Sequence, residues 1–178
     1  MEATSRGETG SVLTGMFRDR ESTEQAYNSM RGRGYTDDEI NVMMSDKTRD
    51  SQYGEGTADT ELGNKALEGT GAGAAIGGTL GAIIGGIAAI GTSVLLPGLG
   101  LVVAGPIAAA LVGAGAGGLT GGLVGALIGW GIPEEHAKLY EEGIANGGTV
   151  VGVTPRNQED ADYFESEWKN YRGEHIYR

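Results

Sequence analysis

The sequence predicts an α+β fold, in which a split ferredoxin-like α/β domain carries an inserted glycine-zipper helical hairpin, transmembrane or re-entrant. Three observations lead to this expectation. A run of 65 residues, from Gly69 to Pro133, contains no Asp, Glu, Lys, Arg or His, so every charged residue lies in the two flanks. Each flank combines short apolar runs typical of strands with helical patterns. Within the charge-free run, glycine recurs at every fourth position.

The first flank predicts a β-α-β unit over residues 11–45, after a polar tail at 1–10. Residues 11–17 have strand character. The pattern Ser22-Thr-Glu-Gln25 fits a capping box that opens a helix, which glycine ends near residues 32–34. Residues 36–39 then form a turn, and residues 40–45 form a second strand.

The second flank, residues 133–178, predicts α-β-α-β after a polar linker expected at 46–68. Pro133 opens a helix that the glycines at 147–148 end, and residues 149–154 form a strand. Asn157 caps a further helix, and residues 175–177 add an edge strand. Because each flank is too small to bury much apolar surface alone, we expect the two to fold together as a plait. This would bring both ends of the apolar block to the same side of the molecule.

The apolar block, residues 69–132, predicts two helices at 72–90 and 107–130 on either side of a turn at Pro97-Gly98. At about 1.5 Å per residue, each helix is about as long as the hydrocarbon core of a bilayer is thick. The glycine rows predicted to pack the helices together are Gly73, Gly77, Gly81 and Gly85 in the first and Gly113, Gly117, Gly121, Gly125 and Gly129 in the second. The neighbouring rows, predicted to face lipid or a neighbouring chain, are Ile76, Leu80 and Ile84 with Leu119, Leu123 and Leu127.

The glycine rows favour a lipid surrounding. Each helical glycine costs about 1 kcal/mol relative to alanine in water, whereas in hydrocarbon an unpaired backbone amide costs several kcal/mol. Lipid therefore enforces the helix, and glycine lets two backbones approach closely. Each helix has more small surface than one partner covers, so we expect membrane lipid and further copies of the chain as partners. A hairpin buried in a soluble assembly and a disordered linker are the alternatives.

Composition argues against several other functions. The net charge of −11 disfavours nucleic-acid binding, and the absence of cysteine excludes disulfides and thiolate metal sites. Residues 113–118 match G-x-G-x-x-G, but no strand precedes them, so we expect no dinucleotide site. His136 beside Glu135 is expected to be solvated, and neither it nor His175 has a placed nucleophile nearby. We therefore expect no enzymatic site, no cofactor, no metal and no small-molecule substrate.

The segments Thr14-Gly-Met-Phe-Arg-Asp-Arg-Glu-Ser-Thr-Glu-Gln-Ala-Tyr and Arg33-Gly-Tyr-Thr-Asp-Asp-Glu-Ile-Asn-Val-Met-Met-Ser resemble the bacterial general-stress, heat-induced stress-protein family. The run from Gly131 to Gly148 is similar to the segment that follows the hydrophobic insert in members that carry one. The resemblance implies a small α/β domain and a bacterial stress association, with no catalytic residue to transfer.

The sequence thus predicts a non-enzymatic stress protein that inserts its hairpin into the membrane, homo-oligomerises, and packs or remodels the bilayer. Because the N-terminus is polar and acidic, without a secretory signal, we expect the bacterial cytoplasmic membrane with both charged flanks cytoplasmic. One alternative is an oligomeric channel. The other is a soluble, self-assembling cytoplasmic particle whose hairpins form an apolar, lipid-filled interior.

Overall fold

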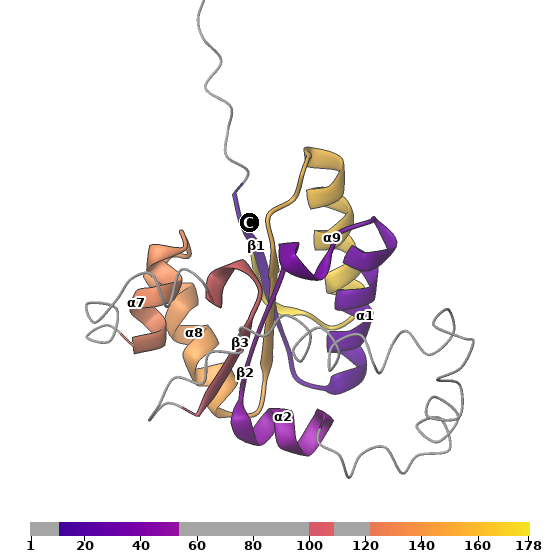
Figure 1. The fold of residues 1–178 in the computed structure, drawn as a ribbon. Coiled ribbons are helices and arrows are strands. Elements are labelled where there is room, and N and C mark those ends of the chain that lie inside the picture. The colour runs from indigo at the N-terminus through magenta and orange to yellow at the C-terminus, as the bar shows by residue number, and fades with distance from the viewer. Residues whose placement is uncertain (1–10, 54–99, 109–121) are drawn as a thin grey trace, which may run out of the picture.

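The computed structural model describes residues 11–53, 100–108 and 122–178, and these form one antiparallel sheet with helices on both of its faces (Figure 1). The strands are β1 (Leu13–Phe17), β2 (Ile40–Ser45), β3 (Leu101–Ala104), β4 (Thr149–Val153) and β5 (Glu174–Tyr177). The helices are α1 (Arg20–Gly32), the short 3-10 helix η1 (Asp37–Glu39), α2 (Asp46–Tyr53), α7 (Gly122–Gly129), α8 (Glu134–Ala145) and α9 (Gln158–Asn170).

The sheet order is β3-β2-β4-β1-β5, with every neighbouring pair antiparallel. Strand β4 of the second flank lies between β1 and β2 of the first, pairing Val151 with both Gly15 and Val42. The expectation that the flanks fold together is therefore confirmed, as is the α+β class. Neither flank could form this sheet alone, because its central strand and that strand's two neighbours come from different flanks.

Helices α1 and α9 cover one face of the sheet, and α7 and α8 cover the other (Figure 1). Because successive side chains of a strand point to opposite faces, each strand supplies both sides. In β1, Leu13 and Phe17 join the cluster under α1 and α9, whereas Met16 joins the cluster under α7 and α8. The domain therefore has two hydrophobic cores separated by one sheet.

Local sequence signals place the helices of the first core. The side chain of Asp19 accepts a hydrogen bond from the backbone N–H of Ser22 and caps α1, and Asn157 caps α9 in the same way through Asp160. The predicted capping box at Ser22 is thus wrong: Ser22 lies inside the first turn, and the cap is three residues earlier. The prediction of an Asn157 cap is confirmed.

Two parts of the chain differ from their predicted structure. Residues 46–53, expected to begin a polar linker, form helix α2, whose first amide donates to the carbonyl of Gly100. Residues 101–104, expected inside the helical hairpin, form β3 and pair with β2. The charge-free run thus contributes a strand to the sheet, because Leu101-Val-Val-Ala104 is also a good buried strand. The predicted turn at Pro97-Gly98 lies outside the described residues.

Each tryptophan packs over a strand glycine. A Cβ on Gly15 of β1 would lie 3.0 Å from Cε3 of Trp168, and a Cβ on Gly152 of β4 would lie 2.8 Å from Cη2 of Trp130. The two glycines lie on neighbouring strands and face opposite sides of the sheet. Their missing side chains let one large aromatic ring approach the backbone from each face.

Candidate functional site

Helix α7 is the part of the predicted site that the structure describes. Its sequence, Gly-Leu-Val-Gly-Ala-Leu-Ile-Gly, contains no polar side chain. Leu123 and Leu127 are only 4% and 0% exposed, and they pack in the core cluster beneath α7 and α8. At these two positions the structure differs from the prediction, because the leucines face the chain's own sheet instead of lipid or a neighbouring chain.

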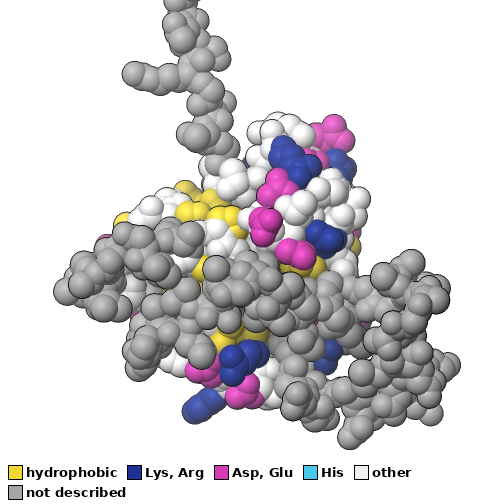
Figure 2. All heavy atoms as spheres, in the orientation of Figure 1, with side chains coloured by type: hydrophobic (Ala, Val, Ile, Leu, Met, Phe, Trp, Pro, Cys, Tyr) yellow, Lys and Arg dark blue, Asp and Glu magenta, His cyan; other side chains and the backbone are white. Residues whose placement is uncertain are grey.

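The opposite side of α7 faces away from the sheet. Ile128 is 44% exposed, and a Cβ added to Gly125 or Gly129 would meet no described heavy atom within 4 Å. Figure 2 shows acidic and basic side chains interspersed over α1 and α9. Within the described residues, α7 therefore presents an apolar outer surface that no other element covers.

The other predicted packing residues lie outside the described residues. These are Gly73, Gly77, Gly81, Gly85, Gly113, Gly117 and Gly121, together with Ile76, Leu80, Ile84 and Leu119. Among residues 11–53, 100–108 and 122–178, no helix combines the length and apolar character needed to cross a bilayer.

Glycines with a positive φ bracket α7. Gly122, its first residue, has φ +57°, and Gly131, two residues beyond its end, has φ +96°. Side-chain-bearing residues rarely adopt this left-handed conformation. Between Gly131 and α8, Ile132 is buried in the same core as the two leucines. The helix is thus a short apolar rod that the chain enters and leaves through glycine turns.

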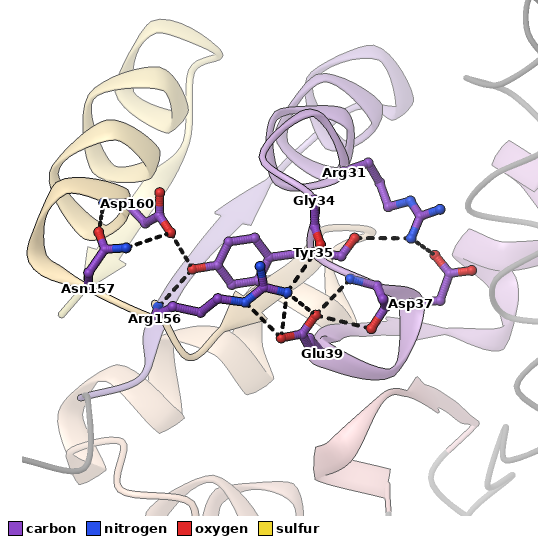
Figure 3. A network of polar contacts seen from close by, with 9 residues as sticks. Arg31, Gly34, Tyr35, Asp37, Glu39, Arg156, Asn157 and Asp160 are labelled. Carbon is purple, nitrogen blue, oxygen red and sulfur yellow. Dashed lines mark hydrogen bonds and ion pairs between the residues drawn. The ribbon is translucent and has the colours of Figure 1, made fainter.

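A second group of residues joins the two flanks at the edge where α1 ends and α9 begins. The Tyr35 hydroxyl donates to Oδ2 of Asp160 at 2.8 Å and accepts from the backbone N–H of Arg156 at 2.7 Å. The Arg156 guanidinium lies 4.2 Å from the centre of the Tyr35 ring and donates to both carboxylate oxygens of Glu39. Figure 3 shows Tyr35 reaching from the loop after α1 to the start of α9, with Arg156 running back to Glu39. We call Tyr35, Glu39, Arg156 and Asp160 the polar clasp.

Charges in the polar clasp are balanced by direct pairing. Arg156 holds the pKa of the Glu39 carboxyl at about 2, helped by hydrogen bonds from Thr36. Burial and the bond to Asp160 raise the pKa of Tyr35. On the other side of Asp160, Arg33 pairs with Oδ1 at 2.8 Å and stacks 4.2 Å from the centre of the Tyr163 ring. These pairings hold the loop after α1 against the start of α9, and they thereby join the first flank to the second.

A third polar contact fastens β5 to the sheet. The Tyr140 hydroxyl of α8 donates to the backbone carbonyl of His175 at 2.6 Å and bonds Oγ1 of Thr14 at 2.8 Å. His175 has φ +49°, and the register between β1 and β5 shifts at this point. His136, expected to be solvated, lies with its ring centre 5.0 Å from that of Tyr177.

Two observations concern the chemistry that the described residues could support. In the described ranges, no group of three or more His, Asp or Glu side chains is arranged to hold a metal ion. The ionised groups of the polar clasp bind one another.

No family model, no curated protein and no solved structure matches this chain.

The polar clasp was missed by sequence reasoning. Tyr35 and Asp160 are separated by 125 residues, and no local pattern links them. Two local signals were available: Thr36 and Glu39 have capping-box spacing, and Asn157 caps a helix in which Asp160 is the third residue.

Proposed function

We propose that this chain is a non-enzymatic protein that attaches to lipid through its charge-free run and associates with further copies of itself. The observation that carries this proposal is α7, which is apolar on all sides although only one side is covered by described residues. A helix that is hydrophobic all round belongs in a core or in a membrane. The charged, mixed surface over α1 and α9 suits the aqueous side of such an arrangement (Figure 2).

The length of the apolar segment before β3 favours shallow insertion over two full crossings. The described part of the chain ends at Tyr53 and resumes at Gly100, whose carbonyl accepts from the first amide of α2, so both ends of the segment lie at the same domain. A segment that leaves and returns to one domain crosses a bilayer an even number of times. Two crossings need about 40 apolar residues, whereas the charge-free stretch before Gly100 has 31. We therefore favour a re-entrant hairpin.

We also propose a more specific fold for the described domain. With β3 set aside, the order β2-β4-β1-β5 and its antiparallel pairing support a ferredoxin-like plait, to which β3 adds an edge strand. The resemblance of residues 14–27 and 33–45 to the bacterial heat-induced stress proteins supports a role in packing or remodelling the cytoplasmic membrane under stress. In this proposal the folded domain stays in the cytoplasm.

Flotation with neutral phosphatidylcholine vesicles, followed by a carbonate wash, tests the attachment. Purified protein is expected to float with the vesicles and to resist the wash. Protein that stays at the bottom of the gradient as large, detergent-free assemblies would contradict the proposal and favour the soluble particle.

Glycine variants test the association. Leucine at Gly77, Gly81, Gly117 and Gly121 together is expected to reduce assembly size in mild detergent, because side chains then separate the helix backbones. Alanine at Gly32, at the end of α1, is the control: a Cβ there meets no described atom within 4 Å, and the position lies outside the charge-free run. An unchanged assembly size in the fourfold variant would rule out glycine packing.

A further inference from the structure

The turn between α8 and β4 contains the only Asn-Gly pair of the chain, Asn146-Gly147. Asn146 is exposed and follows the last residue of α8, and Gly147 has φ +90°. An asparagine side chain can react with the backbone nitrogen of the next residue, and glycine hinders this approach least because it has no Cβ. Sequence and exposure together make Asn146 a candidate site of modification.

The folded turn holds both reacting groups in hydrogen bonds. The side-chain Nδ2 of Asn146 donates to the carbonyl of Glu142 at 2.9 Å. The amide of Gly147 donates to the carbonyl of Ile144 at 3.1 Å. Ring closure needs Cβ of Asn146 and the nitrogen of Gly147 to lie nearly eclipsed about the Cα–C bond, whereas the ψ angle of 17° at Asn146 keeps them apart. The reaction therefore requires the end of α8 to open.

The end of α8 can open without disturbing the core. Ala145 and Asn146 are exposed, and Gly147 is half-buried. The buried positions begin at Ile144 on one side and at Gly148 on the other. Surface helix ends open locally at a much lower free energy than that needed to unfold the whole domain. The turn can therefore unwind while both of its neighbours stay packed.

The chemistry needs only water as a co-reactant. In the open turn, the nitrogen of Gly147 attacks Cγ of Asn146, and the new C–N bond closes a succinimide ring. The bond between Cγ and Nδ2 breaks, and Nδ2 leaves as ammonia with the proton that the Gly147 amide gives up. Water then opens the ring at either carbonyl, which yields an aspartyl or an isoaspartyl residue.

We propose that Asn146 is a site of spontaneous deamidation, controlled by the opening of the last turn of α8, and that its products loosen the junction between α8 and β4. This inference is independent of lipid attachment. Either product places a carboxylate where the amide of Asn146 donated to a carbonyl, at the helix end that disfavours negative charge. The exposed side chains of Glu141 and Glu142 already lie at this end.

The isoaspartyl product also adds a carbon to the main chain of a tightly packed turn. The amide of Gly148 donates to the carbonyl of Gly143 at 2.8 Å, and a Cβ on Gly148 would lie 2.9 Å from the same oxygen. The next residue, Thr149, pairs with Phe17 of β1 and Met44 of β2. Modification of one exposed side chain therefore affects the start of the central strand.

Peptide mapping by mass spectrometry, after the full-length protein is incubated at mildly alkaline pH, tests the site. The peptide with Asn146 is expected to convert into aspartyl and isoaspartyl forms, which are heavier than the parent and separate from each other. Asn170 is the internal control, because it is exposed at the end of α9 but is followed by Tyr171. Equal conversion at the two asparagines would overturn the proposal. So would an Asn146 that stays unchanged in the folded protein while the urea-unfolded chain converts.

The variant Ala145→Gly tests the control by helix opening. Glycine at this exposed last position of α8 weakens the helix end and should speed the conversion of Asn146 about two- to fivefold. The matched control is Ser166→Gly, which weakens α9 at an exposed position and should leave the rate unchanged. Equal rates in the two variants would show that the last turn of α8 does not control the reaction.

Hydrogen exchange tests the effect on the junction. Aged protein, separated from unmodified protein by anion exchange, should exchange its amides faster at residues 145–150. The variant Asn146→Asp adds the same charge without the extra main-chain carbon, so it should show a smaller increase. Unchanged exchange at these residues in the aged protein would overturn the loosening of the junction.

Discussion

The hydroxyl of Tyr35 donates a hydrogen bond to Oδ2 of Asp160, which lies 125 residues further along the chain. Tyr35 is 1% exposed and Asp160 is 7% exposed, so the bond forms away from bulk water. The same hydroxyl accepts from the backbone N–H of Arg156. One oxygen atom therefore links the loop after α1 to the start of α9, across the whole length of the apolar insertion.

Replacing Tyr35 with phenylalanine is expected to destabilise the domain by about 1–3 kcal/mol, because the buried carboxylate of Asp160 and the backbone amide of Arg156 each lose a partner. Urea unfolding measures the change. Tyr163→Phe is the matched control: its ring stays available to Arg33, and the described structure records no hydrogen bond from its hydroxyl. Equal losses in the two variants, both of which keep the aromatic ring, would show that the Tyr35 hydroxyl bonds add no specific stability.

The pair Glu39–Arg156 predicts a defined pH dependence. The pKa of Glu39 in the folded protein is about 2, below its ordinary value of 4.5, because Arg156 binds the carboxylate. The pair therefore stabilises the domain fully above about pH 4.5, and this contribution is lost as the pH falls towards 2. Since both side chains are more than a third exposed, the contribution should stay below about 1 kcal/mol.

Glu39→Gln tests this pH dependence through urea midpoints at a series of pH values. The gap in unfolding free energy between wild type and variant should be constant above pH 5 and should close near pH 2. Glu141→Gln, an exposed position on α8, controls for the removal of one surface carboxylate. A gap that persists unchanged at pH 2 would argue against the ion pair as its source.

Local patterns predicted much of the fold, whereas long-range contacts escaped prediction. Asn157 marks the start of α9 and the glycines at 147–148 follow the end of α8, and each signal depends only on residues next to its own helix. The predicted bounds of α8 and α9 are therefore close to those in the structure. Strand β3 was missed because Leu101-Val-Val-Ala104 lies in an apolar run, where a buried strand and a buried helix have the same composition.

The candidate site was predictable only in part, for a related reason. The charge-free run and its glycine period are visible in the sequence, but the direction in which Leu123 and Leu127 point depends on the sheet beneath them. Tyr35 and Asp160 meet only because β4 inserts between β1 and β2. Because strand order brings these two residues together, no local sequence pattern predicts their contact.

Gly143 of α8 permits close contact with Met16 of β1. A Cβ at Gly143 would lie 1.8 Å from Sδ of Met16, which is fully buried. Gly143→Ala is therefore expected to cost about 1–3 kcal/mol by overpacking, and Met16→Ala about 2–5 kcal/mol by leaving a cavity. The double variant should be more stable than the sum predicts by about 0.5–3 kcal/mol, since the new methyl group occupies vacated space. Strict additivity in urea unfolding would contradict the contact.

The bond from Tyr140 to the carbonyl of His175 predicts that β5 depends on α8. Tyr140→Phe removes the donor and leaves Thr14 without its partner, so a loss of about 1–3 kcal/mol is expected. Hydrogen exchange should speed up most in Glu174–Tyr177.

The backbone of His175 gives a separate prediction. Because His175 has φ +49°, glycine there should be tolerated, whereas valine should destabilise the strand. Equal stability of the glycine and valine variants would contradict the strained backbone.

Gly125 offers a test in which domain stability and self-association should move in opposite directions. In the isolated domain, Gly125→Ala meets open space among the described residues and should raise the unfolding free energy by about 0.5–1 kcal/mol, because alanine is the better helix former. In an assembly whose helices touch at Gly125, the same methyl group should hold the backbones apart and shift sedimentation towards smaller species. Gly32→Ala, equally open at the end of α1, should leave association unchanged. If Gly125→Ala leaves the assembly size unchanged, Gly125 does not pack against a neighbouring helix. The outer face of α7 would then contact lipid only.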